Sequence, residues 1–318
     1  MKTSHRLQAV LVAAIWGVNF VAIEIGLRDL PPLVLTALRF VVAAVPLIFL
    51  VPRPTARLRY VVGYGLVLGV LKFGVLFTAL AAGMPAGLAA LVLQAQALMS
   101  VLLAAMVLRE RPARSQMAGV LVGSAGIGVL AVSSGGRATV IGFALTLFAA
   151  ASWAVANLVM RASKESRPLS LLVWSSLVPP LPLFGLAGVV DGPRAVLDAI
   201  TGLSLRSILA VAYVAYVSTL VGFGIWNRLI TRYSVARVAP FSLLVPVFGL
   251  SASWLFLDER VGATELVAAA IVLVGLALVV RRSDSARPPE ITPATSGESV
   301  RAGRRHASAL VDSTQDQA

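Results

Sequence analysis

Apolar residues fall into ten runs along the chain, each close to the length that a helix needs to cross a bilayer. Such a helix takes about 20 mostly apolar residues. The connections between runs are short, so consecutive helices must run antiparallel. The pattern therefore predicts an all-α integral membrane protein with ten transmembrane helices. The predicted helices cover residues 8–27, 33–51, 61–80, 86–108, 116–133, 139–160, 169–190, 206–230, 235–257 and 263–280.

Composition supports this fold class and excludes several functions. Of the 318 residues, 58% are hydrophobic and only 13% are charged, whereas a soluble domain carries about a quarter charged residues. The net charge is +13, but the arginines lie at the ends of runs and not on one basic face, so we predict no nucleic-acid partner. There is no cysteine, and His5 and His306 lie outside the apolar runs. We therefore predict no metal, no cofactor and no enzymatic activity.

Arginine and lysine residues alternate between connections, and this sets the expected orientation. Every second connection is poor in positive residues, with Arg28, Arg137, Arg194 and Arg260. Because positive residues favour the cytoplasmic side, we predict a multi-pass protein of the inner (plasma) membrane with both termini in the cytoplasm. The basic set comprises Arg53, Arg57, Arg59, Arg109, Arg111, Arg114, Arg161, Lys164, Arg167, Arg228, Arg232 and Arg237, with Lys2, Arg6, Arg281 and Arg282 at the two ends.

Two segments of the chain resemble each other. Residues 91–111 align without gaps with residues 240–260, which places the sequence LRER on LDER. Five helices repeated once give an odd number of spans in each half, so the second half must cross the membrane upside down. Inverted repeats of this kind are typical of secondary transporters. We predict a first repeat at 1–134, a second at 139–281, and a disordered cytoplasmic tail at 282–318.

The residues that end the fourth helix of each half give a resemblance to a known family. The stretches that carry it are Glu110-Arg111, Glu259-Arg260, 15-IWGVNFVAIEIGL-27, 29-DLPPLVLTALRF-40, 83-GMPAGLAALVLQAQ-96, 171-LLVWSSLVP-179 and 238-VAPFSLLVPVFGL-250. They resemble the EamA family of the drug/metabolite transporter superfamily, and most of all its bacterial amino-acid metabolite exporters of the cysteine and O-acetylserine type. The resemblance covers about residues 7–281 and implies paired five-helix domains. One departure is Glu24, where such proteins often carry a lysine.

Lys72 is a cation in the middle of an apolar run. It lies about 12 Å from the nearer end of its helix, at 1.5 Å per residue. Its stem cannot reach the surface, and a central charge costs about 2.5 kcal/mol or more. Gly65, Gly69 and Ala79 share its helical face, and small residues mark packed faces. Lys72 therefore points inward, either as a cation for a substrate carboxylate or in a structural role, as part of an ion pair or as a donor to backbone carbonyls.

Arg39 is closer to a helix end and has several possible roles. At about 9 Å from that end its guanidinium could snorkel to the interface, pair with Glu24, or contact a substrate. Glu24 has its own alternative partner in Arg28, one turn along the helix.

Amides and tryptophans complete the candidate substrate-binding set. Gln94 shares a face with small residues, whereas Gln96, about 200° away, shares a bulkier face, so Gln94 is the candidate of the two. Trp16 with Asn19 and Trp153 with Asn157 form matched pairs, one in each half, and each either lines the cavity or packs helices. The candidate residues are Lys72, Gln94, Trp16, Asn19, Trp153, Asn157 and Arg39.

These features predict a secondary transporter that works by alternating access. The resemblance implies export of a small amino-acid-like metabolite, zwitterionic or anionic, with the lipid bilayer as the other partner. The alternative is a carrier of another small molecule, such as a sugar, a nucleobase or a drug. The chain has no GxxxxGK[ST] motif, so it brings no ATPase of its own. Proton coupling and facilitated diffusion both stay open.

Overall fold

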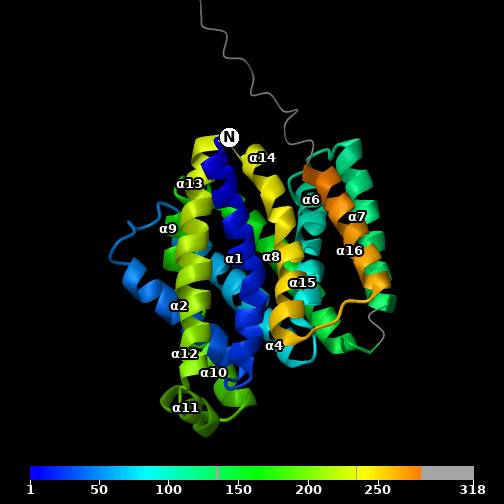
Figure 1. Ribbon diagram of the computed structural model, residues 1–318. Coiled ribbons are helices and arrows are strands. Elements are labelled where there is room, and N and C mark those ends of the chain that lie inside the picture. Colours follow the sequence, from blue (N-terminus) through cyan, green and yellow to red (C-terminus); the bar gives the residue numbers. More distant parts are fainter. Residues whose placement is uncertain (134–135, 234, 281–318) are drawn as a thin grey trace, which may run out of the picture. The chain divides into compact units, whose positions relative to one another are not determined.

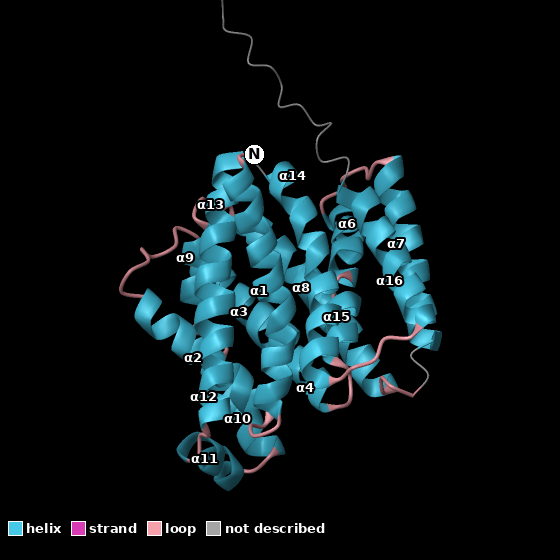
Figure 2. Ribbon diagram, in the orientation of Figure 1, coloured by secondary structure: helices cyan, strands magenta, loops and turns pink. Residues whose placement is uncertain are grey.

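A computed structural model describes residues 1–133, 136–233 and 235–280 of the chain. The predicted tail at 282–318, together with Arg281, lies outside these residues. The described parts consist of helices and the loops that join them, without strands (Figure 2). The described residues belong to one compact unit.

Nine helices in the described residues are long and apolar enough to cross a membrane. Four are continuous: α1 (Thr3–Leu27), α7 (Arg114–Ser133), α8 (Val140–Ser163) and α16 (Ala263–Val280). The other five join shorter elements: α3 (Leu58–Gly65), η1 (Leu66–Gly74) and α4 (Val75–Ala81); α5 (Ala86–Val92) and α6 (Ala95–Val107); α9 (Pro168–Ser175) and α10 (Pro180–Val190); α12 (Leu205–Ala212), η2 (Tyr213–Gly222) and α13 (Phe223–Tyr233); and η3 (Ala239–Leu243) with α15 (Leu244–Leu257). Two further helices, α11 (Pro193–Thr201) and α14 (Val235–Val238), are short.

The predicted second span is shorter than the sequence suggested. It forms α2 (Pro32–Leu47), a helix of 16 residues, which is about 24 Å long and falls short of a hydrocarbon core of about 30 Å. Pro46 lies in its last turn, and a proline there disrupts the helical hydrogen bonding. The chain then turns, and Phe49 and Leu50 are among its most exposed large apolar side chains.

The bundle has two distinct ends (Figure 1). The first residues of α1 and the last residues of α16 lie at one end, called here the N-terminal end, and α11 lies at the opposite end, called the α11 end. The two ends of the described chain therefore lie at the same end of the bundle. Figure 1 also shows α7 and α16 side by side. They touch through glycines. A Cβ on Gly119 would lie 2.5 Å from the carbonyl oxygen of Gly275, so a residue with a side chain does not fit at this position.

Two spans are interrupted by π-helical segments. The third span contains η1 over nine residues and the eighth contains η2 over ten. Such segments are rare and occur often at functional sites. The two spans hold equivalent positions in the two predicted halves, so each half carries the same irregularity.

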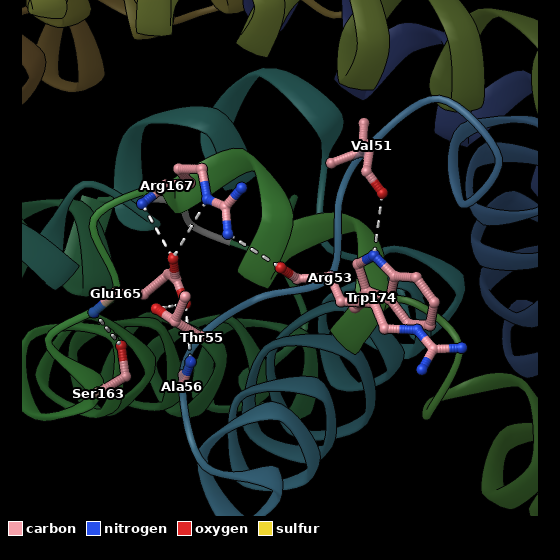
Figure 3. A network of polar contacts seen from close by, with 8 residues as sticks. All are labelled: Val51, Arg53, Thr55, Ala56, Ser163, Glu165, Arg167 and Trp174. Carbon is pink, nitrogen blue, oxygen red and sulfur yellow. Dashed lines mark hydrogen bonds and ion pairs between the residues drawn. The ribbon is translucent and has the colours of Figure 1, made fainter.

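Matched acidic residues tie the two predicted halves together. Asp29, after α1, accepts hydrogen bonds from Ser204, the N-cap residue of α12, at 2.6 Å. Glu165, after α8, accepts from the Thr55 hydroxyl at 2.9 Å and the Ala56 N–H at 2.8 Å, just before α3 (Figure 3). In each case an acid after the first helix of one half holds the start of the third helix of the other half.

The Glu165 contacts belong to a wider network at the N-terminal end (Figure 3). Burial raises the pKa of Glu165, but hydrogen bonds from Ala56, Thr55 and Arg167 outweigh that effect and hold the pKa below its usual value. Next to it, the indole N–H of Trp174 donates to the carbonyl of Val51 at 3.2 Å. The loop after α2 is therefore fixed at several points.

Candidate substrate-binding site

One cavity of about 320 Å³ lies among the described helices. Its volume is within the range of small-molecule sites, about 300–1,000 Å³. The structure brings all seven candidate residues of the sequence analysis to its lining. They are Lys72, Gln94, Trp16, Asn19, Trp153, Asn157 and Arg39.

The cavity is not centred between the two ends of the bundle. Its lining reaches Met160 and Val280, which lie in the last turns of α8 and α16 at the N-terminal end. Toward the α11 end it stops at Phe20 and Leu76, with one to two helical turns of α1 and α4 beyond them. The cavity is therefore nearer to the N-terminal end.

Lys72 is buried in η1, with 4% of its surface exposed. Its ammonium nitrogen lies 3.1 Å from the centre of the Phe73 ring and 4.6 Å from that of Trp153. Among the described residues no acid forms an ion pair with it, and no acceptor forms a hydrogen bond with it. The prediction that Lys72 avoids lipid is confirmed, and the structural ion pair is not found.

Lys72 lies within a π-helical segment, where the spacing of 100° per residue that its predicted helical face assumed does not hold. Gly65 and Gly69 instead face the turn between α9 and α10. A Cβ on Gly65 would lie 2.5 Å from the carbonyl oxygen of Ser175, and one on Gly69 would meet the ring of Pro179. These glycines bring the two spans into contact.

Arg39 lies inside the bundle and does not snorkel. Its side chain is 4% exposed, and one nitrogen donates to the hydroxyl of Thr219 at 3.2 Å. Its guanidinium carbon lies 3.9 Å from the Phe73 ring centre and 5.0 Å from that of Phe40. The proposed pair with Glu24 is not formed among the described contacts. Thr219 of η2 and the aromatic ring faces provide partners for the guanidinium inside the bundle, so the side chain does not extend to the membrane interface.

Lys72 and Arg39 share the same aromatic ring and lie close together. Their charged groups lie 3.1 and 3.9 Å from the Phe73 centre, so the ammonium nitrogen and the guanidinium carbon are at most about 7 Å apart. Two like charges at that distance repel by about 2 kcal/mol at an effective dielectric constant of 20. The described lining contains no aspartate or glutamate to offset them.

An aromatic cluster forms another part of the lining. The Trp16 ring centre lies 5.1 Å from those of Phe223 and Trp226. The indole N–H of Trp16 donates to the carbonyl of Ser218 in η2 at 3.1 Å. One helical turn away, Asn19 is 8% exposed and its side-chain oxygen is buried without a hydrogen-bond partner. The site thus offers ring faces and an unused acceptor besides its cations.

The amide assignments needed one correction. Gln94 lines the cavity as predicted, and its amide donates to the carbonyl of Ser242 at 3.4 Å. Gln96 lines the cavity too, and its side-chain oxygen accepts from Asn157 at 3.1 Å. The two side chains were predicted to lie on different faces because a continuous helix was assumed. The chain turns between α5 and α6, and that turn brings both amides to one side.

At the α11 end, carboxylates join distant parts of the chain, and the sequence did not predict these contacts. Glu259, after α15, accepts from the N–H groups of Ala86 and Gly87 at 2.8 and 3.0 Å, at the start of α5. Glu265, in the first turn of α16, is 1% exposed and pairs with Arg137 at 2.8 Å. The only sequence signal was the repeated Glu-Arg motif, which marked Glu259 but not its distant partner.

Comparison with known proteins agrees with this architecture. Residues 5–132 and 140–281 each match the EamA-like transporter family. The chain is 42% identical over 282 residues to a probable amino-acid metabolite efflux pump of Escherichia coli, covering 87% of this chain and 94% of that protein. It is 31% identical to a probable terminal-alkyne amino-acid exporter of Streptantibioticus cattleyicolor, covering 92% and 99%.

A solved crystal structure shares the fold, although its sequence has diverged. Its TM-score is 0.59 at 20% identity, and the match covers 90% of this chain and all of that one. The two family matches extend over most of the chain and over both predicted halves. The protein is a multi-pass membrane protein that belongs to the EamA-like transporter family.

Proposed function

We propose that this protein is a secondary transporter that exports a small amino-acid-like metabolite, of the cysteine or O-acetylserine type, across the inner membrane. The observation that carries the proposal is Lys72, a buried cation that lines a small-molecule cavity without an acidic partner. Intramembrane ionisable groups of this kind mark substrate paths. The names of the relatives, an amino-acid metabolite efflux pump and an amino-acid exporter, support the class of cargo.

A zwitterionic metabolite matches the groups around the cavity. Its carboxylate would pair with Lys72, and Arg39 stands close enough to share it. Its ammonium would lie over the rings of Trp16 and Trp226, since cations are attracted to aromatic faces. The unused oxygen of Asn19 supplies an acceptor for the same group. The amides of Gln94 and of the Gln96–Asn157 pair would orient the rest of the molecule.

The protein is organised as two inverted repeats, at 1–134 and 139–281. Support comes from the two separate family matches, from the π-helical segments in the third and eighth spans, and from the matched acids Asp29 and Glu165. In such proteins the halves rock around a central site, which opens to one side of the membrane and then to the other.

The described conformation corresponds to the loading state of an exporter. Basic loops at the N-terminal end favour the cytoplasm, so both termini are cytoplasmic and the α11 end faces outward. The cavity approaches the cytoplasmic end at Met160 and Val280. Glu259 holds α5 at the outer end. Cargo would enter from the cytoplasm and leave after this outer contact breaks.

Transport by purified protein in proteoliposomes tests the function. We expect export of cysteine or O-acetylserine and a loss of at least 100-fold in Lys72→Ala, because the carboxylate loses its partner in a low-dielectric site. Lys2→Ala, at the exposed N-terminus, is the matched control and should transport normally. Full export by a folded Lys72→Ala protein would refute the role of Lys72.

The choice of cargo and driving force is tested in the same vesicles. A panel of sugars, nucleobases and cationic drugs covers the alternative cargoes, and transport of these without amino-acid metabolites would overturn the proposal. An imposed pH gradient distinguishes proton exchange from facilitated diffusion. Glu24, with a buried oxygen that has no partner, is the residue to vary if the gradient drives export.

A further inference from the structure

Two basic side chains line the cavity, and a single carboxylate would neutralise only one of them. Lys72 and Arg39 are each 4% exposed and both line it. A guanidinium stays protonated in proteins, so burial does not remove the charge of Arg39. Two cations in one apolar site need compensation by an anion or by several strong dipoles.

The described protein does not provide that compensation. Arg39 donates one hydrogen bond, to a neutral hydroxyl, and its Nε and Nη1 nitrogens are buried without partners. Lys72 has only the ring faces of Phe73 and Trp153. Ring faces attract cations but compensate only part of the cost of desolvation. Unused buried donors on a guanidinium are an unusual feature of a folded protein.

The geometry allows one anion to contact both groups. The ammonium nitrogen and the guanidinium carbon are at most about 7 Å apart, as their distances to the shared Phe73 ring require. Charge-assisted hydrogen bonds are about 2.8 Å long, so a small anion that lies between the two groups would be within reach of both. A cavity of 320 Å³ has room for that anion and for water besides.

We propose that Arg39 and Lys72 form one anion site that holds a small inorganic anion, such as chloride, whenever the transporter carries no cargo. The carboxylate of the cargo replaces this anion on loading, and the anion returns when the cargo leaves. This inference rests on the proposed function for the identity of the replacing group. The cargo and inorganic anions therefore compete for the same site.

Tryptophan fluorescence gives a direct test on the purified full-length protein. Iodide quenches indole emission on contact, and Lys72 holds its charge 4.6 Å from the Trp153 ring. At constant ionic strength, kept with a bulky sulfonate that the cavity is too small to admit, we expect a saturable quenching component. Chloride and the cargo should each suppress it. Quenching that rises linearly with iodide and ignores chloride would overturn the proposal.

Variants assign the component to the two cations. Lys72→Gln and Arg39→Gln should each raise the half-saturating iodide concentration at least tenfold, and Trp153→Phe should remove the signal. Arg53→Gln is the matched control, because Arg53 lies 5.4 Å over the ring of Trp174 in a surface loop, and it should keep the component. If a glutamine variant fails to fold, Lys72→Arg keeps the charge and should retain saturation.

The test separates this inference from the function it builds on. Export of amino-acid metabolites that is lost in Lys72→Ala but is insensitive to chloride would leave the proposed function in place and refute the anion site. Saturable anion binding without any export of amino-acid metabolites would refute the proposed function and leave the anion site in place.

Discussion

The two ends of the bundle differ in how equivalent glutamates are used. Glu259 and Glu110 occupy the same position in the repeated motif. At the α11 end Glu259 accepts two backbone hydrogen bonds from the start of α5. At the N-terminal end Glu110 forms an ion pair with Arg161, and both side chains are about half exposed. One glutamate holds two spans together, and its counterpart lies on the surface.

This difference supports the proposed conformation, in which the α11 end is closed. A carboxylate on free N–H groups at a helix start is a strong contact, since it satisfies donors that the helix leaves unpaired. An exposed ion pair contributes little. The cavity lies nearer the end where the contact is weak. In an inverted repeat, transport requires the two ends to exchange these arrangements, so Glu110 would take up the role of Glu259 in the outward-open state.

The largest expected effect is a difference in access to the two ends. The natural chain has no cysteine, so single cysteines can be introduced cleanly. We expect Met160→Cys to react with a membrane-impermeant maleimide at least tenfold faster from the cytoplasmic side than from outside. Leu76→Cys, on the lining at the closed end, should be protected from outside reagent. Equal reaction of both cysteines from outside would contradict the assigned state.

The next largest effect should come from Glu259→Gln. It removes a charge that two N–H groups share, and hydrogen bonds to charged groups contribute about 1.5–3 kcal/mol. A shift of that size should raise outside labelling of Leu76→Cys by about tenfold or more. Glu110→Gln is the matched variant and should leave the labelling unchanged. An identical response to both substitutions would remove the distinction between the ends.

A smaller effect is expected at the acids that tie the halves together. The pKa of Glu165 is lowered from 4.5, so its stabilisation is present above that pH and is lost as pH falls through the lowered pKa. Glu165→Gln should lower the melting temperature by a few degrees at pH 7, and the difference from the natural protein should disappear in strong acid. Asp29→Asn, at the other end, should show the same dependence, because Ser204 and Arg206 lower the pKa of Asp29.

The smallest effect is expected for Arg161→Gln. Exposed ion pairs contribute about 0–1 kcal/mol, so removal of the Arg161–Glu110 pair should leave the melting temperature unchanged within error. Differential scanning fluorimetry of the purified protein measures this. A loss comparable with that of Glu165→Gln would show that the N-terminal end is held more firmly than the described contacts indicate.

The residues of the candidate site could be predicted from the sequence more completely than the contacts among them. Lys72 was identified because one charge in an apolar run has few acceptable environments, and the tryptophan–asparagine pairs followed from matched positions in two halves. Gln96 was misjudged because a regular helix was assumed, whereas the chain turns between α5 and α6. The environment of Arg39 was not foreseen, because its hydrogen-bond partner Thr219 lies 180 residues away in the sequence.

The sequence by itself determined the membrane class and the positions of most of the apolar helices, because hydropathy is a local property of the chain. It also singled out the buried cation. Only the tertiary structure decided that Lys72 and Arg39 contact the same ring, that of Phe73, in a described lining that contains no acid. It also decided that Glu259 accepts hydrogen bonds from Ala86 and Gly87. Those contacts join residues far apart along the chain, and a pattern of local spacing carries no information about which distant groups will meet.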